Sequence, residues 1–359
     1  MTGRERVKAA LDHRETDRVP RLLYGEVIGY VPAIEHLLNK KCAPLPPRDY
    51  FKMDLTGLMP NPTRLTIDRF APWYGKNADE AVNSGEIDEW GVRWKKGSYF
   101  HFARIHSPLK AAKDLGTIKK FPLPDLDQAY RFDGLKEKVD KFHKNGFAVA
   151  ALAGSVFEQS WFLRGMDTLM VDMINCPETA HYFFDIASYY QKKLAEAFAK
   201  TGADIIMAGD DVATQRGLMI SIDTWKTFFK PRLTSMVSTV KNIDPGIHVF
   251  YHSCGNIMDL IPELIDTNID ILNPLQPDCL DLSIIKKKYG DRLSFWGSVS
   301  VQNTMPFGTP EDVRAEVTRR IKTLGTGGGF ILSPAHVLGA ETPWDNIDAF
   351  FEAAEIPVY

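Results

Sequence analysis

Short apolar runs alternate with amphipathic stretches along most of this sequence, and the alternation predicts a fold. The runs have the length and composition of buried strands, and most are followed by a stretch of helical periodicity. They lie at 19–24, 55–59, 147–152, 205–208, 247–251, 271–275, 293–296 and 330–332. About eight strands alternating with helices predict an α/β protein with a (β/α)8 TIM barrel. A doubly wound open sheet is the alternative, and the absence of a G-x-G-x-x-G or G-x-x-x-x-G-K-[ST] loop after any strand disfavours it.

Two regions depart from this alternation. The chain starts with a helical pattern over 2–13, where Thr2 and Glu5 have the spacing of a capping box. From about 63 to 125 the pattern changes, and aromatic residues alternate at 90–94 and 99–102, which predicts a β-hairpin. We expect this insertion to form a lid or flap on a single domain of residues 1–359. Its aromatic side chains are candidates to line a cavity, although such side chains more commonly only pack the buried face of a hairpin.

Composition narrows the class of protein. The chain has 359 residues and a net charge of -3. Its 43 basic and 46 acidic residues are interspersed, and we find no basic stripe of the kind that binds nucleic acid. No apolar run approaches the roughly 20 residues that span a bilayer, so we expect no membrane segment. Four widely spaced cysteines and an N-terminus without a signal-peptide pattern favour the reducing cytoplasm.

The clearest candidate for chemistry is the stretch GIHVFYHSCG at 246–255. The run 247–251 is followed by His252 and Cys254, which are two residues apart and so point to the same side of an extended segment. Zn²⁺ favours nitrogen and sulfur ligands of this kind. A small buried thiol beside a core histidine is the simpler interpretation.

Other polar or aromatic residues follow the remaining strands, at the end where the active sites of barrels lie. They are Tyr24, Glu26, Phe157, Glu158, Gln159, Asp210, Asp211, Asn273, Gln276, Cys279, Ser298, Gln302, Ser333 and His336. Cys279 follows the strand after His252 and Cys254, so these three residues form the first candidate zinc set, with Glu158 and His336 as further ligands.

Adjacent carboxylates at Asp210 and Asp211 form a second candidate. Two carboxylates after a strand can act as acid or base, and their proximity raises the pKa of one of them. The alternative is that one caps the next turn and the other is solvated.

Several stretches together resemble the uroporphyrinogen decarboxylase superfamily. They are RERVKAALDHRETDRVP, GDDVATQRGLMIS, YHSCGNIMDLIPELIDTNIDILNPLQPDCLDL, GDRLSFWGSVSVQNTMPFGTPEDVRAEV and GGGFILSPAH. The superfamily has a cofactor-free decarboxylase branch, in haem biosynthesis, and a branch of zinc methyltransferases that work with corrinoid proteins. The decarboxylase branch carries an arginine-rich segment after its first strand, where this chain has YGEVIGY at 24–30. An octa-anionic substrate needs such donors, so the resemblance favours the methyltransferase branch.

The methyltransferase resemblance implies a specific site. Its His-x-Cys matches His252 and Cys254, while coenzyme M members take a further cysteine from the last strand, where this chain has Ser333-Pro-Ala-His336. Coenzyme M is therefore disfavoured as substrate, and Cys279, then Glu158, replaces the missing ligand. The resemblance implies Zn²⁺ as Lewis acid on the atom that leaves the methyl group.

The remaining roles follow from the same resemblance. Glu158, Asp210 and Asp211 are candidate proton carriers, and cobalamin must arrive on a partner corrinoid protein, since the chain has no D-x-H-x-x-G motif. An aromatic methyl ether suits a pocket of aromatic and polar side chains. Its predicted members are Tyr24, Glu26, Phe157, Trp161, Gln276 and His336.

Two other functions stay open at this point. One is a decarboxylase of a tetrapyrrole or a smaller carboxylic acid, in which Asp210 or Asp211 protonates the intermediate. The other is a binding protein in which the His/Cys group is structural. The sequence gives neither the methyl donor nor the oligomeric state, and a homodimer is compatible with it.

Overall fold

The computed structural model describes residues 1–95 and 104–357 and divides the chain into two compact units. Unit 1 comprises Met1–Met59, Gly134–Ala153 and Ala195–Tyr359, and unit 2 comprises Pro60–Asp133 and Gly154–Leu194. The predicted insertion at about 63–125 lies within the first segment of unit 2. A single domain over the whole chain stays a prediction.

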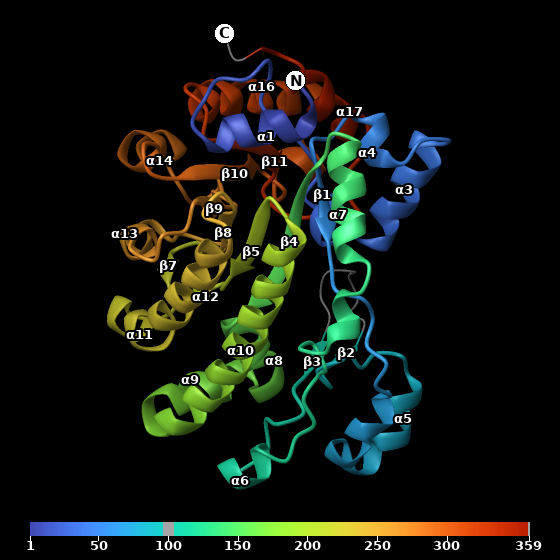
Figure 1. Ribbon diagram of the computed structural model, residues 1–359, viewed down its shortest axis with the longest axis vertical. Helices are drawn as coiled ribbons and strands as arrows, with labels where there is room; N and C mark the ends of the chain where they lie inside the picture. The colour runs from blue at the N-terminus through green and yellow to red at the C-terminus, as the bar shows by residue number, and fades with distance from the viewer. Residues whose placement is uncertain (96–103, 358–359) are drawn as a thin grey trace. The chain divides into compact units, whose positions relative to one another are not determined.

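Unit 1 is built on a seven-stranded sheet of order β1-β4-β5-β8-β9-β10-β11 (Figure 1). Its strands are β1 Leu55–Leu58, β4 Ala148–Ser155, β5 Ile205–Gly209, β8 His248–His252, β9 Ile271–Asn273, β10 Ser294–Val299 and β11 Phe330–Pro334. β1 pairs with β4, β5 with β8, and β8 to β11 pair in turn, all in parallel. Most strand residues are buried, as expected for parallel strands covered on both faces. Seven of the predicted strands are confirmed within a few residues.

The first predicted strand, at 19–24, is instead an extended segment with one bridge, between Arg21 and Leu332 of β11. On its other side Asp54 donates its backbone N–H to the Arg21 carbonyl at 3.0 Å. The Arg21 N–H, however, donates to the Asp54 carboxylate at 2.8 Å, so a side chain replaces the backbone acceptor that a ladder needs. The segment still joins β11 to the start of β1 and closes the sheet, and the predicted α/β barrel class is confirmed.

Helices connect these strands. In unit 1 they are α1 Gly3–Leu11, α2 Gly25–Ile28, α3 Pro32–Cys42, α4 Pro47–Tyr50, α7 Leu135–Lys144, α11 Ile222–Phe228, α12 Lys230–Ile243, α13 Ile261–Ile265, α14 Leu282–Tyr289, α15 Thr304–Phe307, α16 Pro310–Arg320 and α17 Trp344–Ala353. The capping box of α1 is present as predicted, with Thr2 and Glu5 satisfying each other's backbone N–H groups. A short pair, β6 Ala213–Thr214 and β7 Gly217–Leu218, follows β5. α10 Pro177–Thr201 begins in unit 2 and ends in unit 1.

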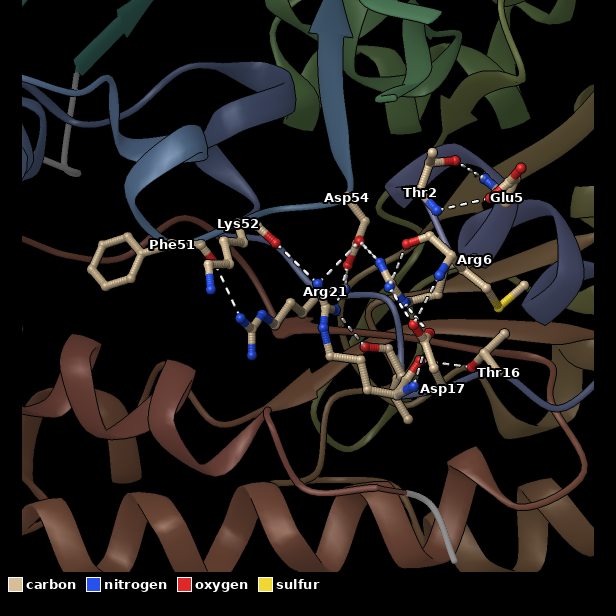
Figure 2. A network of polar contacts seen from close by, with 12 residues as sticks. Thr2, Glu5, Arg6, Thr16, Asp17, Arg21, Phe51, Lys52 and Asp54 are labelled. Carbon is tan, nitrogen blue, oxygen red and sulfur yellow. Dashed lines mark hydrogen bonds and ion pairs between the residues drawn. The ribbon is translucent and has the colours of Figure 1, made fainter. Parts of the chain in front are cut away.

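An ion-pair network surrounds Asp54, the residue immediately before β1 (Figure 2). Its carboxylate, which is 1% exposed, accepts from the Arg6 guanidinium at 2.5 Å and from Arg18 at 2.7 Å. Arg6 also donates to Asp17 at 2.6 and 2.7 Å, and Arg21 pairs with Glu355. The network therefore ties α1, the closing segment and the start of β1 together at the strand starts, opposite the strand ends where chemistry is expected.

Unit 2 is made of short helices and a two-stranded sheet. Its helices are α5 Ala78–Asn83, α6 Leu115–Ile118, α8 Phe157–Arg164 and α9 Met166–Asn175, with 3₁₀ turns at Ile67–Trp73, Gly75–Asn77 and Ala129–Phe132. β2 Arg93–Lys95 pairs with β3 Arg104–His106 in antiparallel register. The two arms of a hairpin are thus present. Tyr99 to Phe102, predicted as its second aromatic set, lie outside the described residues. Within the described part of the chain, none of the helices has the length and apolar character needed to cross a membrane.

Candidate metal and active site

The ends of β8 and β11 bring three potential metal ligands together. His252 is the last residue of β8, Cys254 follows two residues later, and His336 lies two residues beyond β11. Their ligand atoms all lie within 4.8 Å of one another, and each residue is partly buried. The Cys254 Sγ lies 3.4 Å from His252 Nε2, and the two imidazole rings are 5.7 Å apart between centroids. The arrangement offers two nitrogens and one sulfur, a set that suits Zn²⁺.

Asn273, at the end of β9, contacts the other nitrogen of His252. Residues 252 and 273 are register partners between β8 and β9. The Asn273 Oδ1 lies 2.5 Å from His252 Nδ1, and its Nδ2 donates to the Trp296 carbonyl at 2.9 Å. The imidazole is thus held from the side opposite Cys254.

Two side chains hold the backbone of the loop that carries Cys254. Asp211, after β5, accepts from the Cys254 N–H at 2.7 Å, and Gln276, after β9, accepts from the Gly255 N–H at 3.1 Å. Gly255 has φ +90, and a Cβ there would lie 2.6 Å from the Thr214 carbonyl oxygen, so the tight turn requires glycine. The Asp211 Oδ1 also lies 3.5 Å from His252 Nε2, which places a carboxylate beside the His/Cys/His group.

Tyr24 packs against both histidines of the group. Its ring lies parallel to His252 at 6.0 Å and is 5.9 Å from His336. Burial raises the pKa of Tyr24 well above its usual range, and the nearby Cys254 and Asp211 add to the effect, so its hydroxyl stays protonated. Burial, together with repulsion from His252, lowers the pKa of His336 to about 4. A neutral imidazole is the form that binds metal.

Cys279, the first predicted choice for the third ligand, is not in this group, which contains His336, a further predicted ligand. After β9 the side chain of Gln276 turns toward Gly255, and the Cys279 thiol points back to the Gln276 carbonyl oxygen at 3.7 Å. Cys279 instead lines a separate cavity of about 560 Å³ with Asp278. Burial and the Asp278 carboxylate raise the pKa of its thiol, which disfavours the thiolate that a metal needs.

Two other predicted carboxylates have partners of their own. Asp210 is 4% exposed and accepts from the Tyr251 hydroxyl at 3.3 Å. Glu26, on α2, accepts from the Thr56 hydroxyl at 2.9 Å and from Tyr30 at 3.2 Å. Burial raises the pKa of the Glu26 carboxyl. The predicted catalytic role of Asp210 and the substrate-binding role of Glu26 stay predictions.

The remaining predicted residues belong to α8 of unit 2. Phe157 and Glu158 form its first turn; Phe157 is fully buried, and Glu158 and Trp161 are partly buried. The Trp161 ring lies edge-on to Phe162 at 4.3 Å. The predicted roles of Phe157, Glu158 and Trp161 stay predictions.

Asn273 is the site residue to which the sequence alone assigned no role, although it was among the polar residues at strand ends. A signal for it existed. It ends the strand that follows the His252 strand, and neighbouring parallel strands that end at the same level place their last side chains together.

Comparisons with known proteins identify the family of this chain. The uroporphyrinogen decarboxylase family model matches residues 91–356. The chain is 26% identical over 229 residues to a methylated-thiol–coenzyme M methyltransferase of Methanosarcina mazei, covering 63% of this chain and 58% of the relative. It is 26% identical over 186 residues to a uroporphyrinogen decarboxylase of Trichodesmium erythraeum, covering 50% of this chain and 48% of the relative. The chain thus spans about half of the length of these curated relatives.

A solved structure extends the likeness over the whole fold. A methyltransferase from Methanosarcina mazei superposes with a TM-score of 0.67 at 19% identity, covering 99% of this chain and 98% of that one, which shows the same fold. The resemblance found in the sequence is confirmed, since the family model matches and a methyltransferase occurs among the curated relatives together with uroporphyrinogen decarboxylases. Because the family model covers well over half of the chain, this protein belongs to the uroporphyrinogen decarboxylase family.

Proposed function

We propose that this protein is a zinc-dependent methyltransferase that moves a methyl group from a small methylated substrate, an aromatic methyl ether, to the corrinoid of a separate protein. The observation that carries the proposal is the convergence of His252, Cys254 and His336 at the strand ends. The similarity to the methylated-thiol–coenzyme M methyltransferase supports the reaction class.

The three residues fit a zinc ion in chemistry and spacing. Bonds of about 2.0–2.3 Å in a tetrahedral site place neighbouring ligand atoms roughly 3.5 Å apart. The 3.4 Å between Cys254 Sγ and His252 Nε2 already has this value, and His336 lies within 4.8 Å. His252, Cys254 and His336 would hold a zinc ion with three protein ligands, the number found in catalytic sites that also bind substrate.

Demethylation of an ether requires help at the leaving atom. When the methyl carbon departs, the ether oxygen keeps the electron pair of the broken C–O bond and needs a positive charge or a proton. A bound Zn²⁺ would supply Lewis acidity to that oxygen. Asp211, whose carboxylate lies 3.5 Å from His252 Nε2, would hold the proton. Tyr24, whose hydroxyl is protonated, would form one wall of the site with its ring.

The surroundings of Ser333 argue against coenzyme M as the substrate. Activating a thiol for attack benefits from an electron-rich ion, and a second thiolate ligand would provide it. Here Ser333 stands at the end of β11, where the coenzyme M members are expected to have a cysteine, and its hydroxyl donates to the Pro334 carbonyl at 2.7 Å. One thiolate and two imidazoles would leave more positive charge on a bound zinc ion than two thiolates would, which suits stabilisation of a leaving oxygen.

A decarboxylase is the second candidate, favoured by the match to the uroporphyrinogen decarboxylase of Trichodesmium erythraeum. A porphyrinogen needs arginines for its carboxylates. In this chain Arg18 and Arg21, near the first strand position, are bound to Asp54 and Glu355 at the strand starts. A decarboxylase reaction here would therefore use a smaller acid, with Asp210 or Asp211 as proton donor.

Metal content and methyl transfer test the proposal together. We expect one zinc per chain in the wild type, loss of zinc in His252→Ala, Cys254→Ala and His336→Ala, and full zinc in the matched control Cys279→Ala. We expect the zinc-loaded protein to methylate a cob(I)alamin carrier protein from at least one donor in a panel of methoxylated aromatics and methylamines. Inactivity with every donor, or zinc retained after both His252→Ala and Cys254→Ala, contradicts the proposal. Decarboxylation of uroporphyrinogen or a smaller acid would favour the second candidate.

A further inference from the structure

We infer that Asn273 is a positioning residue that fixes the tautomer and orientation of His252, so that Nε2 is the nitrogen offered to a metal. The inference rests on the proposed function only for the identity of the metal. The contacts of Asn273 with His252 and Trp296 do not depend on that function. Asn273 is fully buried, and its side chain lies between the His252 ring on β8 and the Trp296 carbonyl on β10. One amide therefore connects three neighbouring strands.

The direction of the Asn273 amide follows from its two contacts. The Trp296 carbonyl can only accept, so the group that faces it at 2.9 Å must be the Asn273 NH₂. The Asn273 oxygen then faces His252 Nδ1 at 2.5 Å. A reversed amide would set oxygen against oxygen at Trp296 in a fully buried place and leave the buried carbonyl without a donor.

The His252 tautomer follows from the amide direction. An amide oxygen only accepts, so His252 Nδ1 must carry the hydrogen. In a neutral imidazole the lone pair then lies on Nε2, the atom 3.4 Å from Cys254 Sγ. The opposite tautomer would point an N–H into the group and leave the Asn273 oxygen without a donor. The structure is thus arranged for metal binding through Nε2 before any ion arrives.

The chemistry of the partner also matters. A carboxylate at this position would share the Nδ1 hydrogen and make the imidazole a stronger donor, which lowers the charge felt by a substrate on the ion. The amide of Asn273 carries no charge and only accepts from Nδ1. An amide partner therefore suits a site that must stabilise an anionic leaving atom.

The tautomer can be measured in the wild-type protein without metal. In ¹⁵N NMR of histidine-labelled, zinc-free protein we expect His252 to carry its hydrogen on Nδ1. An Nε2–H tautomer overturns the inference whatever the variants do. Because this measurement needs neither zinc nor activity, its outcome is independent of the proposed function.

Zinc affinity of variants measures the consequence. We expect Asn273→Leu to bind zinc 10–100-fold more weakly in competition with a chelator, the usual effect of removing the partner of a ligand histidine. Asn273→Asp keeps an acceptor for Nδ1 and should bind zinc more tightly than Asn273→Leu, while its second oxygen, which faces the Trp296 carbonyl, should lower the Tm. Unchanged affinity in a folded Asn273→Leu, or no rescue by the aspartate, contradicts the inference.

A matched control distinguishes a positioning role of Asn273 from a general loss of stability. Asn346 is also buried and uses its amide to donate to the Met305 and Gly308 carbonyls at 2.9 Å. We expect Asn346→Leu to lower the Tm without changing zinc affinity. A wild type that binds no zinc would defeat the proposed function, while the NMR result would still decide the role of Asn273.

Discussion

Asp211 accepts a hydrogen bond from the Cys254 backbone N–H at 2.7 Å and lies 3.5 Å from His252 Nε2, so one carboxylate contacts both candidate ligands. Its side chain is 44% exposed, which leaves it accessible to a substrate. We expect Asp211→Asn, which retains an acceptor for the loop, to keep full zinc and to lower kcat about 10²–10⁴-fold through loss of proton transfer. Metal analysis and single-turnover methyl transfer measure the two effects.

Asp210 provides the contrast to Asp211. It is buried and accepts from the Tyr251 hydroxyl, so we expect Asp210→Asn to change the Tm more than the rate of methyl transfer. If Asp210→Asn lowers the rate of methyl transfer more than Asp211→Asn does, Asp210 and not Asp211 holds the proton.

Gly209 lets β5 and β8 approach closely beside the candidate site. It is the register partner of His252, and a Cβ there would lie 2.6 Å from the His252 Cβ and 2.4 Å from its carbonyl oxygen. We expect Gly209→Ala to displace His252, to cost about 1–3 kcal/mol of unfolding free energy, and to weaken zinc binding. Denaturant unfolding and chelator competition measure both. Gly246→Ala, just before the same strand, is the control and should leave zinc affinity unchanged; equal affinity in the two variants would contradict the expectation.

Asp54 organises the network at the strand starts (Figure 2). Its buried carboxylate compensates the charges of Arg6 and Arg18. Removing the charge from such a pair leaves buried guanidinium groups uncompensated, so we expect Asp54→Asn to cost about 3–5 kcal/mol in unfolding free energy. Urea titration measures this. Because the network lies away from the candidate ligands, zinc stoichiometry of the folded fraction should stay at one; a loss of less than about 1 kcal/mol would contradict the role of Asp54.

Asp17 makes part of this stability depend on pH. The hydrogen bond from Arg6 holds the pKa of the Asp17 carboxyl well below its usual range. A depressed folded-state pKa stabilises the protein above the unfolded value of about 4, and this contribution is lost as the pH falls through the folded-state pKa. The side chain is 46% exposed, so screening limits the effect of Asp17→Asn at pH 7 to about 1 kcal/mol. The difference from the wild type should shrink below about pH 4; a difference that grows on acidification would contradict this assignment.

Sequence patterns predict the sheet well because buried parallel strands are continuous apolar runs. The runs at 205–208 and 330–332, for example, became β5 and β11 with one or two further residues. The run at 19–24 does not form a strand, and the pattern of apolar residues does not reveal why. The Asp54 side chain takes the N–H of Arg21, and only the folded chain places these residues together.

The candidate site also contains residues that the sequence predicts and residues that it does not. His252 and Cys254 could be predicted because their spacing on a strand end fixes a common direction. Cys279 was the expected third ligand because it follows the adjacent strand, but the direction of a loop side chain depends on local turns. The contact of Gln276 with Gly255 leaves Cys279 facing elsewhere, while closure of the barrel brings in His336.

The most direct test of the central claim is X-ray absorption at the zinc K edge of the wild-type protein. The account predicts one zinc with a single sulfur neighbour at about 2.3 Å and nitrogen or oxygen neighbours at about 2.0–2.1 Å. The sulfur should disappear in Cys254→Ala and persist in Cys279→Ala. A wild-type spectrum with two sulfur neighbours, or a protein that takes up no zinc, would contradict it.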